Sequence, residues 1–145
     1  MKLSLKSLSL SLISSLLLAS CTVDSPVNTT KQFLSLWQKE QYDQAASFII
    51  KAIPQENNRF KIESLSGEEK TEFIKNLKKQ KGRLGKFEVQ NAVPLNKAVL
   101  EKLQTGEGYE VFFYTETEKK GSENKKYYLL KVDNNWRILS TFPTP

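Results

Sequence analysis

Apolar residues recur with a helical period in the first half of this chain and with a strand period in the second half. Three apolar stripes precede Gly85, and each predicts one helix. The stripes are Phe33, Leu34 and Trp37; Tyr42, Ala45, Ala46, Ile49 and Ile50; and Phe73, Ile74 and Leu77. The expected capping residues are Thr29 with Gln32 for the first helix, Asp43 for the second, and Ser66 with Glu69 for the third. We expect the third helix to stop at Gly82.

The second half predicts an antiparallel meander. The expected strands are 87–94, 109–117, 127–132 and 136–141. Alternation is clearest over residues 109–117, where both faces carry aromatic side chains. Asp133 to Asn135 tolerate left-handed geometry and are expected to turn the chain between the last two strands. No single type of secondary structure is predicted for residues 54–65 or for residues 95–108. Helices followed by strands indicate an α+β fold, with N-terminal helices packed on one face of a curved antiparallel sheet.

The first twenty residues have the layout of a secretory signal. Lys2 and Lys6 precede an apolar run from Leu8 to Leu18, and small residues come directly before Cys21, the single cysteine of the chain. The run is too short for the roughly 20 residues of a spanning helix. An ordinary signal peptide fits this layout too. The coincidence of Leu-Ala-Ser with the sole cysteine resembles a bacterial lipobox and favours cleavage before Cys21 and lipidation of its thiol.

The resemblance to bacterial lipoproteins implies a diacylglyceryl thioether on Cys21, often with a third acyl chain such as palmitate on its amino group. Residues 1–20 are then the signal peptide, 21–28 the lipidated cysteine and its tether, and 29–145 one α+β domain. The membrane is the implied partner, because two or more acyl chains anchor stably. Since Thr22 follows the cysteine, the outer membrane facing the periplasm is expected in a Gram-negative cell. In a Gram-positive cell, the outer face of the plasma membrane is expected.

Composition restricts the chemistry of the mature domain. Removal of the signal lowers the net charge from +6 to +4, because that segment holds two lysines and no acidic residue. This mild charge, with no recognised nucleic-acid module, argues against nucleic acid as a partner. The chain has no histidine, and its single thiol is expected to carry lipid. Histidine-based catalysis, disulfides and the usual zinc or haem ligands are therefore excluded, and we expect no cofactor, no metal site and no catalytic residue.

The third helix segregates its charges. Acidic residues occupy its first half, whereas lysines fill its second half and continue to Lys86. This order complements the helix dipole, which is the favoured interpretation. The alternative is that Lys75 to Lys86 form a patch for anionic lipid or a cell-wall polymer.

Three segments carry a resemblance to a known superfamily. They are the helix with Phe33, Leu34 and Trp37, the run Tyr42 to Phe48, and the closing Asp133 to Leu139. Together they resemble small exported domains of the nuclear-transport-factor-two-like, or cystatin-like, superfamily over residues 29–142. The resemblance implies a cone whose mouth can hold a small molecule. The expected pocket residues are Trp37, Tyr42, Phe112, Tyr114, Tyr128 and Trp136.

These observations favour a non-catalytic module of the cell envelope that binds a protein or a small apolar ligand, with an envelope protein as a possible partner. One alternative is a small-molecule enzyme of the isomerase or hydrolase type. By the resemblance, such an enzyme needs an acid or base inside the cone, and Glu110, Tyr114 and Glu116 are the candidates. The other alternative is the lysine patch from Lys75 to Lys86.

Overall fold

The computed structural model describes residues 24–81, 84–117 and 121–140. The predicted signal segment, Cys21 and Gly82 lie outside these residues. The helices are α1 (Pro26–Gln38), α2 (Tyr42–Ala46), the 3-10 turn η2 (Glu56–Asn58), α3 (Gly67–Lys79) and α4 (Lys97–Lys102). The strands are β1 (Ile49–Pro54), β2 (Phe60–Ser64), β3 (Lys86–Pro94), β4 (Gly108–Thr117), β5 (Gly121–Val132) and β6 (Asn135–Leu139). Within this part of the chain, none of the helices has the length and apolar character needed to cross a membrane.

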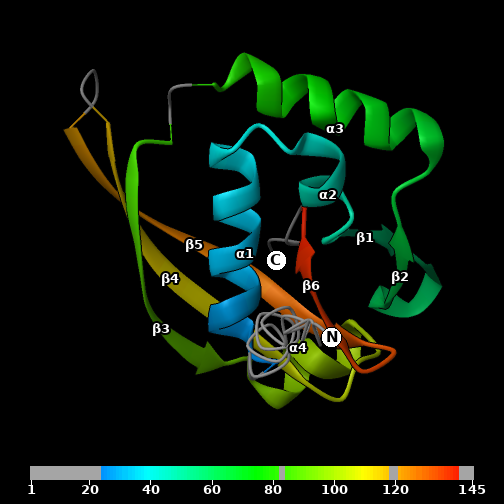
Figure 1. Cartoon of the computed structure of the whole chain (residues 1–145). Coiled ribbons are helices and arrows are strands. Elements are labelled where there is room, and N and C mark those ends of the chain that lie inside the picture. The colour runs from blue at the N-terminus through cyan, green and yellow to red at the C-terminus, as the bar shows by residue number, and fades with distance from the viewer. Residues whose placement is uncertain (1–23, 82–83, 118–120, 141–145) are drawn as a thin grey trace, which may run out of the picture.

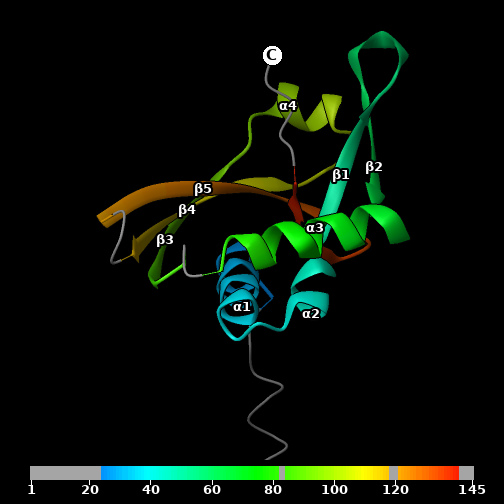
Figure 2. The same cartoon turned by 90° about the horizontal axis from the view of Figure 1, so that it is seen from above.

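One curved sheet of six strands, in the order β2-β1-β6-β5-β4-β3, organises the domain. Helices α1, α2 and α3 cover one face, and α4 lies on the other (Figures 1 and 2). The α+β prediction is confirmed, as is the β4-β5-β6 meander. The sheet departs from the prediction in two respects, because it also contains β1 and β2 and because β1 pairs with β6 in parallel. This pairing places the N-terminal strand inside the sheet, between β2 and β6.

Helix α1 begins earlier than predicted. Ser25 is its N-cap and accepts a hydrogen bond from the Asn28 amide at 3.1 Å, while Pro26 starts the first turn. Proline suits this position because the first amides of a helix have no partner inside it. The expected cap at Thr29 was wrong, since Thr29 is buried inside the helix. Residues 26–28, expected in the tether, therefore belong to α1.

The second predicted helix is wrong beyond Ala46. Helix α2 ends there, and Ile49 and Ile50 open strand β1. These two side chains enter different apolar clusters on opposite faces of the sheet, as alternation in a strand requires. A helix would have placed both on one side, so burial on two faces decides in favour of the strand.

The two unassigned segments form short elements around a second core. Residues 54–65 contain η2 and β2, and 95–108 contain α4, whose N-cap Asn96 accepts from the Val99 amide at 2.9 Å. The Gln104 side-chain amide, just after α4, donates to the Phe60 carbonyl at 2.8 Å and joins the end of α4 to the β1-β2 hairpin. Propensity alone could not assign these segments, because each is stabilised by contacts with the other.

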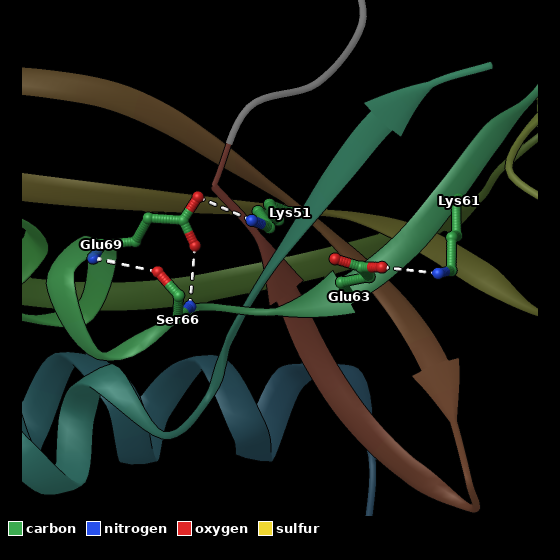
Figure 3. Close-up of polar contacts among 5 residues, drawn as sticks. All are labelled: Lys51, Lys61, Glu63, Ser66 and Glu69. Carbon is green, nitrogen blue, oxygen red and sulfur yellow. Dashed lines mark hydrogen bonds and ion pairs between the residues drawn. The ribbon is translucent and has the colours of Figure 1, made fainter.

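Helix α3 begins with the predicted capping box and is also tied to the sheet. The Glu69 amide donates to the Ser66 hydroxyl at 3.3 Å, and the Ser66 amide donates to the Glu69 carboxylate at 2.7 Å. The other oxygen of the same carboxylate pairs with the Lys51 ammonium of β1 at 2.6 Å (Figure 3). Lys61 and Glu63 form a second ion pair along β2, at 2.7 Å (Figure 3). One carboxylate thus caps a helix and joins it to β1. The helix ends at Lys79, slightly before the predicted stop.

The turn before β6 has the expected conformation. Asp133 and Asn134 both have positive φ, 49° and 63°, as the left-handed prediction requires. Two consecutive residues of this kind make a tight hairpin turn whose twist suits the flanking strands. The meander is therefore held in register at this end by its turn residues.

We expect Gly108→Ala to destabilise the domain by about 1–3 kcal/mol, because a Cβ there would overpack the core beneath α4. It would lie 2.8 Å from Leu95 Cδ1 and 2.9 Å from Leu130 Cδ2. Gly106→Ala is the matched control, since an added Cβ meets nothing within 4 Å. Denaturant unfolding of both variants measures the difference, and equal losses would contradict this packing.

We expect Glu69→Gln to weaken the acid dependence of stability. The Lys51 ammonium, followed by the hydrogen bonds from Ser66, lowers the pKa of Glu69 to about 2. Because the folded-state pKa is lowered, the stabilisation is present above the ordinary value of about 4.5 and is lost as pH falls toward 2. Thermal unfolding between pH 6 and 2.5 measures this slope. Glu68→Gln removes a charge from the same turn as a control, and a parallel slope for wild type and Glu69→Gln would refute the prediction.

Candidate functional site

The structure separates the six predicted pocket residues by the face of the sheet. Trp37, Tyr42 and Trp136 belong to the side covered by α1, α2 and α3. Phe112 and Tyr114 alternate with Val111, Phe113 and Thr115, which are buried beneath α1, and therefore project from the opposite face. Tyr128 packs against the second apolar cluster on that opposite face. The six residues do not line a common pocket.

Aromatic rings fill the helix-covered side of the sheet. Tyr127 lies between Phe33 and Phe113, with ring centroids 5.7 and 4.6 Å apart. Trp136 is only 5% exposed and packs edge to face on Tyr109 at 5.5 Å. Burial raises the pKa of Tyr127, which favours its neutral phenol. These rings act as core side chains that hold α1 on the sheet.

The two carboxylates considered for catalysis lie away from this interior. Glu110 shares the face of Phe112 and Tyr114 and pairs with Lys126 at 3.4 Å. Glu116 lies on the same face and is exposed. Neither carboxylate lies beside a phenol in an enclosed apolar cavity, which is the arrangement that the enzyme alternative needs.

The face of β3, β4 and β5 opposite α1 presents a mixed aromatic and charged surface, which we call the outer wing. It comprises Val93, Glu110, Phe112, Tyr114, Lys126 and Tyr128. The strand register places these side chains next to one another. Glu110 lies between Val93 and Tyr128, and Phe112 lies beside Lys126. Val93 is 43% exposed, and neither Phe112 nor Tyr114 is part of an apolar cluster.

Lys126 organises the polar part of the outer wing. Its ammonium lies 5.1 Å from the centroid of the Tyr128 ring and 3.4 Å from the Glu110 carboxylate. Hydrogen bonding with the Tyr128 hydroxyl, with the charge of Glu110 in support, raises the pKa of Lys126. The surface therefore offers aromatic rings beside one fixed cation. Alternation in the sequence can identify the aromatic residues of the outer wing. The sequence does not show the cross-strand register that brings Lys126 between Glu110 and Tyr128.

Trp37 and Tyr42 lie together elsewhere, at the C-terminal end of α1. They line a cleft of about 250 Å³ with Glu40 and Lys81. Neither Glu40 nor Lys81 was predicted as a member of a pocket. No sequence signal brings Glu40 to Lys81, because their ion pair joins the end of α1 to the segment after α3.

The lysines of α3 are partly neutralised by neighbours. Lys75 pairs with Glu72 at 3.7 Å, and Lys78 lies 5.8 Å from the centroid of the Tyr42 ring. Acidic residues occupy the first turn of α3 and lysines the last, as the dipole interpretation expects. Across the described ranges, we find no cluster of three or more metal-binding side chains.

A crystal structure of a Campylobacter jejuni protein, named as an NTF2-like transpeptidase, resembles this chain with a TM-score of 0.50. The two are 16% identical, and the match covers 81% of this chain and 99% of the other. No protein-family model and no curated protein matches the sequence. At this identity the likeness establishes the fold alone, which is NTF2-like, as the superfamily resemblance implied.

Two adjacent phenylalanines test the assignment of faces. We expect Phe113→Ala to cost about 3–5 kcal/mol because it empties space among the core rings. We expect Phe112→Ala to cost less than about 1 kcal/mol, since that ring lies on the outer wing. Urea unfolding measures both values, and similar losses would mean that the faces are assigned wrongly.

Proposed function

We propose that this chain is a lipid-anchored module of the cell envelope that binds a partner protein through its outer wing and catalyses no reaction. The signal-like segment ending at Cys21 supports the anchor. The observation that carries the binding role is the outer wing itself, where Phe112 and Tyr114 lie beside the Lys126–Glu110 pair. An activity is not carried over from the similar structure, because the fold alone is shared.

The chemistry of the outer wing favours a protein over a small apolar ligand. The helix-covered side is occupied by packed rings, whereas the outer wing is the opposite face of three neighbouring strands. Half-buried aromatic rings beside a cation are typical of protein interfaces, where rings supply contact area and the charge sets orientation. We expect the partner to present apolar side chains together with an acidic group opposite Lys126.

The start of α1 limits how far the anchored domain can lie from the bilayer. Four residues, 22–25, separate Cys21 from the helix, and they reach at most about 14 Å. The N-terminal end of α1 is thus held close to the bilayer. Helix α1 has 13 residues and is about 20 Å long, and α3 lies near its far end (Figure 1). A tether at one point limits the distance of the domain from the bilayer and not its orientation, so anionic lipid and a polymer are both candidate ligands for the lysines of α3.

The anchor is tested with Cys21→Ser. We expect this variant to lose incorporation of radiolabelled palmitate and to leave the detergent-soluble membrane fraction, because the acyl chains supply the membrane affinity. Labelling and fractionation of the source cells measure both effects. Lys97→Gln, an exposed change on α4 outside the motif, serves as a control for expression, and continued labelling of Cys21→Ser would disprove lipidation at this residue.

The binding role is tested by placing a photo-crosslinking phenylalanine analogue at position 112 in the native cells. We expect one envelope protein to be captured, and we expect Tyr114→Lys to abolish the adduct because it adds a charge to the same face. The analogue at Lys97, whose side chain is 91% exposed on α4, is the matched control. Absence of an adduct at 112, or the same adduct at 97, would count against the outer wing as the interface.

A further inference from the structure

The end of α1 contains a glutamate where a glycine is expected. The Glu40 amide donates to the Trp37 carbonyl at 3.0 Å, and the Gln41 amide donates to the Leu36 carbonyl at 2.9 Å. These two bonds form a Schellman motif, whose residue in the left-handed region is usually glycine. Here that residue is Glu40, with φ of 61°. A side chain that is kept at a strained backbone position points to a role for the side chain itself.

The Glu40 carboxylate pairs with the Lys81 ammonium across a cleft. The hydrogen bond and the charge of Glu40 raise the pKa of Lys81, so the lysine is held as a cation. Both side chains are exposed to solvent, 67% for Lys81 and 46% for Glu40. The pair therefore acts as a closed polar contact that an incoming anion can compete for.

Two hollows adjoin at this contact, and they share Glu40 and Tyr42. The first, of about 250 Å³, adds Trp37 and Lys81, and the second, of about 440 Å³, adds Lys78. We call them together the α1–α3 cleft. Lys78 lies 5.8 Å from the centroid of the Tyr42 ring, so each hollow offers one lysine beside an aromatic side chain.

The α1–α3 cleft is also bordered by three amide side chains, Gln38, Gln41 and Gln44, and by Leu84 and the Asp43 carboxylate. An amide offers both donors and an acceptor, which matches the hydroxyl groups of a sugar. Aromatic rings provide flat apolar surfaces on which the C–H face of a sugar ring can stack. Lysines supply charge-assisted hydrogen bonds to carboxylate or phosphate.

We propose that the α1–α3 cleft binds an acidic saccharide. The sugar rings lie on Trp37 and Tyr42, and the acidic groups pair with Lys78 and Lys81. The ion pair between Glu40 and Lys81 breaks when Lys81 pairs with the ligand. An anion without sugar rings would leave the aromatic side chains unused, and a neutral sugar would not displace Glu40. This site is separate from the outer wing, and the proposal depends neither on a protein partner nor on lipidation of Cys21.

The test uses the detergent-solubilised full-length chain and follows tryptophan fluorescence, since Trp37 lies in the cleft and Trp136 is buried. The probes are hexagalacturonate, glucose 1-phosphate, maltohexaose and tripolyphosphate. The first two differ in their acidic group and distinguish a carboxylate from a phosphate ligand. We expect at least one of them to bind about tenfold more tightly than both neutral maltohexaose and ring-free tripolyphosphate.

Four variants assign this binding to the cleft. We expect Lys81→Gln and Tyr42→Ala each to weaken it about fivefold or more, because they remove a charged donor and a stacking ring. Tyr42→Phe retains the ring and is expected to bind nearly as wild type. Glu40→Gln is expected to tighten binding about threefold, since Lys81 is released from its competing carboxylate.

Lys97→Gln is the matched control, because it removes the same charge from α4. Equal weakening by Lys97→Gln and Lys81→Gln would overturn the proposal in favour of unspecific attraction. Tripolyphosphate binding as tightly as the acidic saccharides would overturn the role of the rings. Weaker binding by Glu40→Gln, or no binding of either acidic saccharide, would also overturn it.

Discussion

The structure depends on three neighbouring strands that are buried on both faces. Strands β1, β6 and β5 each carry two adjacent apolar residues, and one of each pair enters each core. These pairs are Ile49 and Ile50, Ile138 and Leu139, and Leu129 and Leu130. Since consecutive side chains of a strand point in opposite directions, both faces at the centre of the sheet must be covered. Helices α1 to α3 cover one side, and α4 with the β1-β2 hairpin covers the other.

The other half of the sheet is covered more completely on one face than on the other. Strands β3 and β4 receive α1 on one face, but α4 extends only over the region around Gly108 and Leu130. Beyond it, Phe112 and Tyr114 remain on the surface, next to a fixed ion pair. The outer wing is thus the part of the sheet that the short helix α4 does not reach, and its availability for a partner follows from the architecture.

Local signals predicted the elements that local interactions stabilise. Ser66 and Glu69 form the expected capping box, and Asp133 and Asn134 adopt the expected turn, because both features involve residues close in sequence. The prediction failed at Ile49–Ile50, since two adjacent isoleucines fit a helical stripe as well as a strand buried on two sides. For the candidate sites, alternation and spacing in the sequence identified the aromatic residues. They did not predict that these residues lie on two faces of the sheet and at the end of α1. That distribution is set by register and by contacts between distant segments.

Helix α1 connects the two proposed functions through its length. Its first turn starts four residues after the expected lipid, and its last turn carries Trp37 and the strained Glu40. A helix of about 20 Å therefore separates the N-cap of α1 from the α1–α3 cleft. A glycine in place of Glu40 would end the helix with less strain but would leave Lys81 without its competing carboxylate. In the proposed saccharide site, the strained backbone at Glu40 is the cost of keeping Lys81 paired until an acidic ligand replaces the carboxylate.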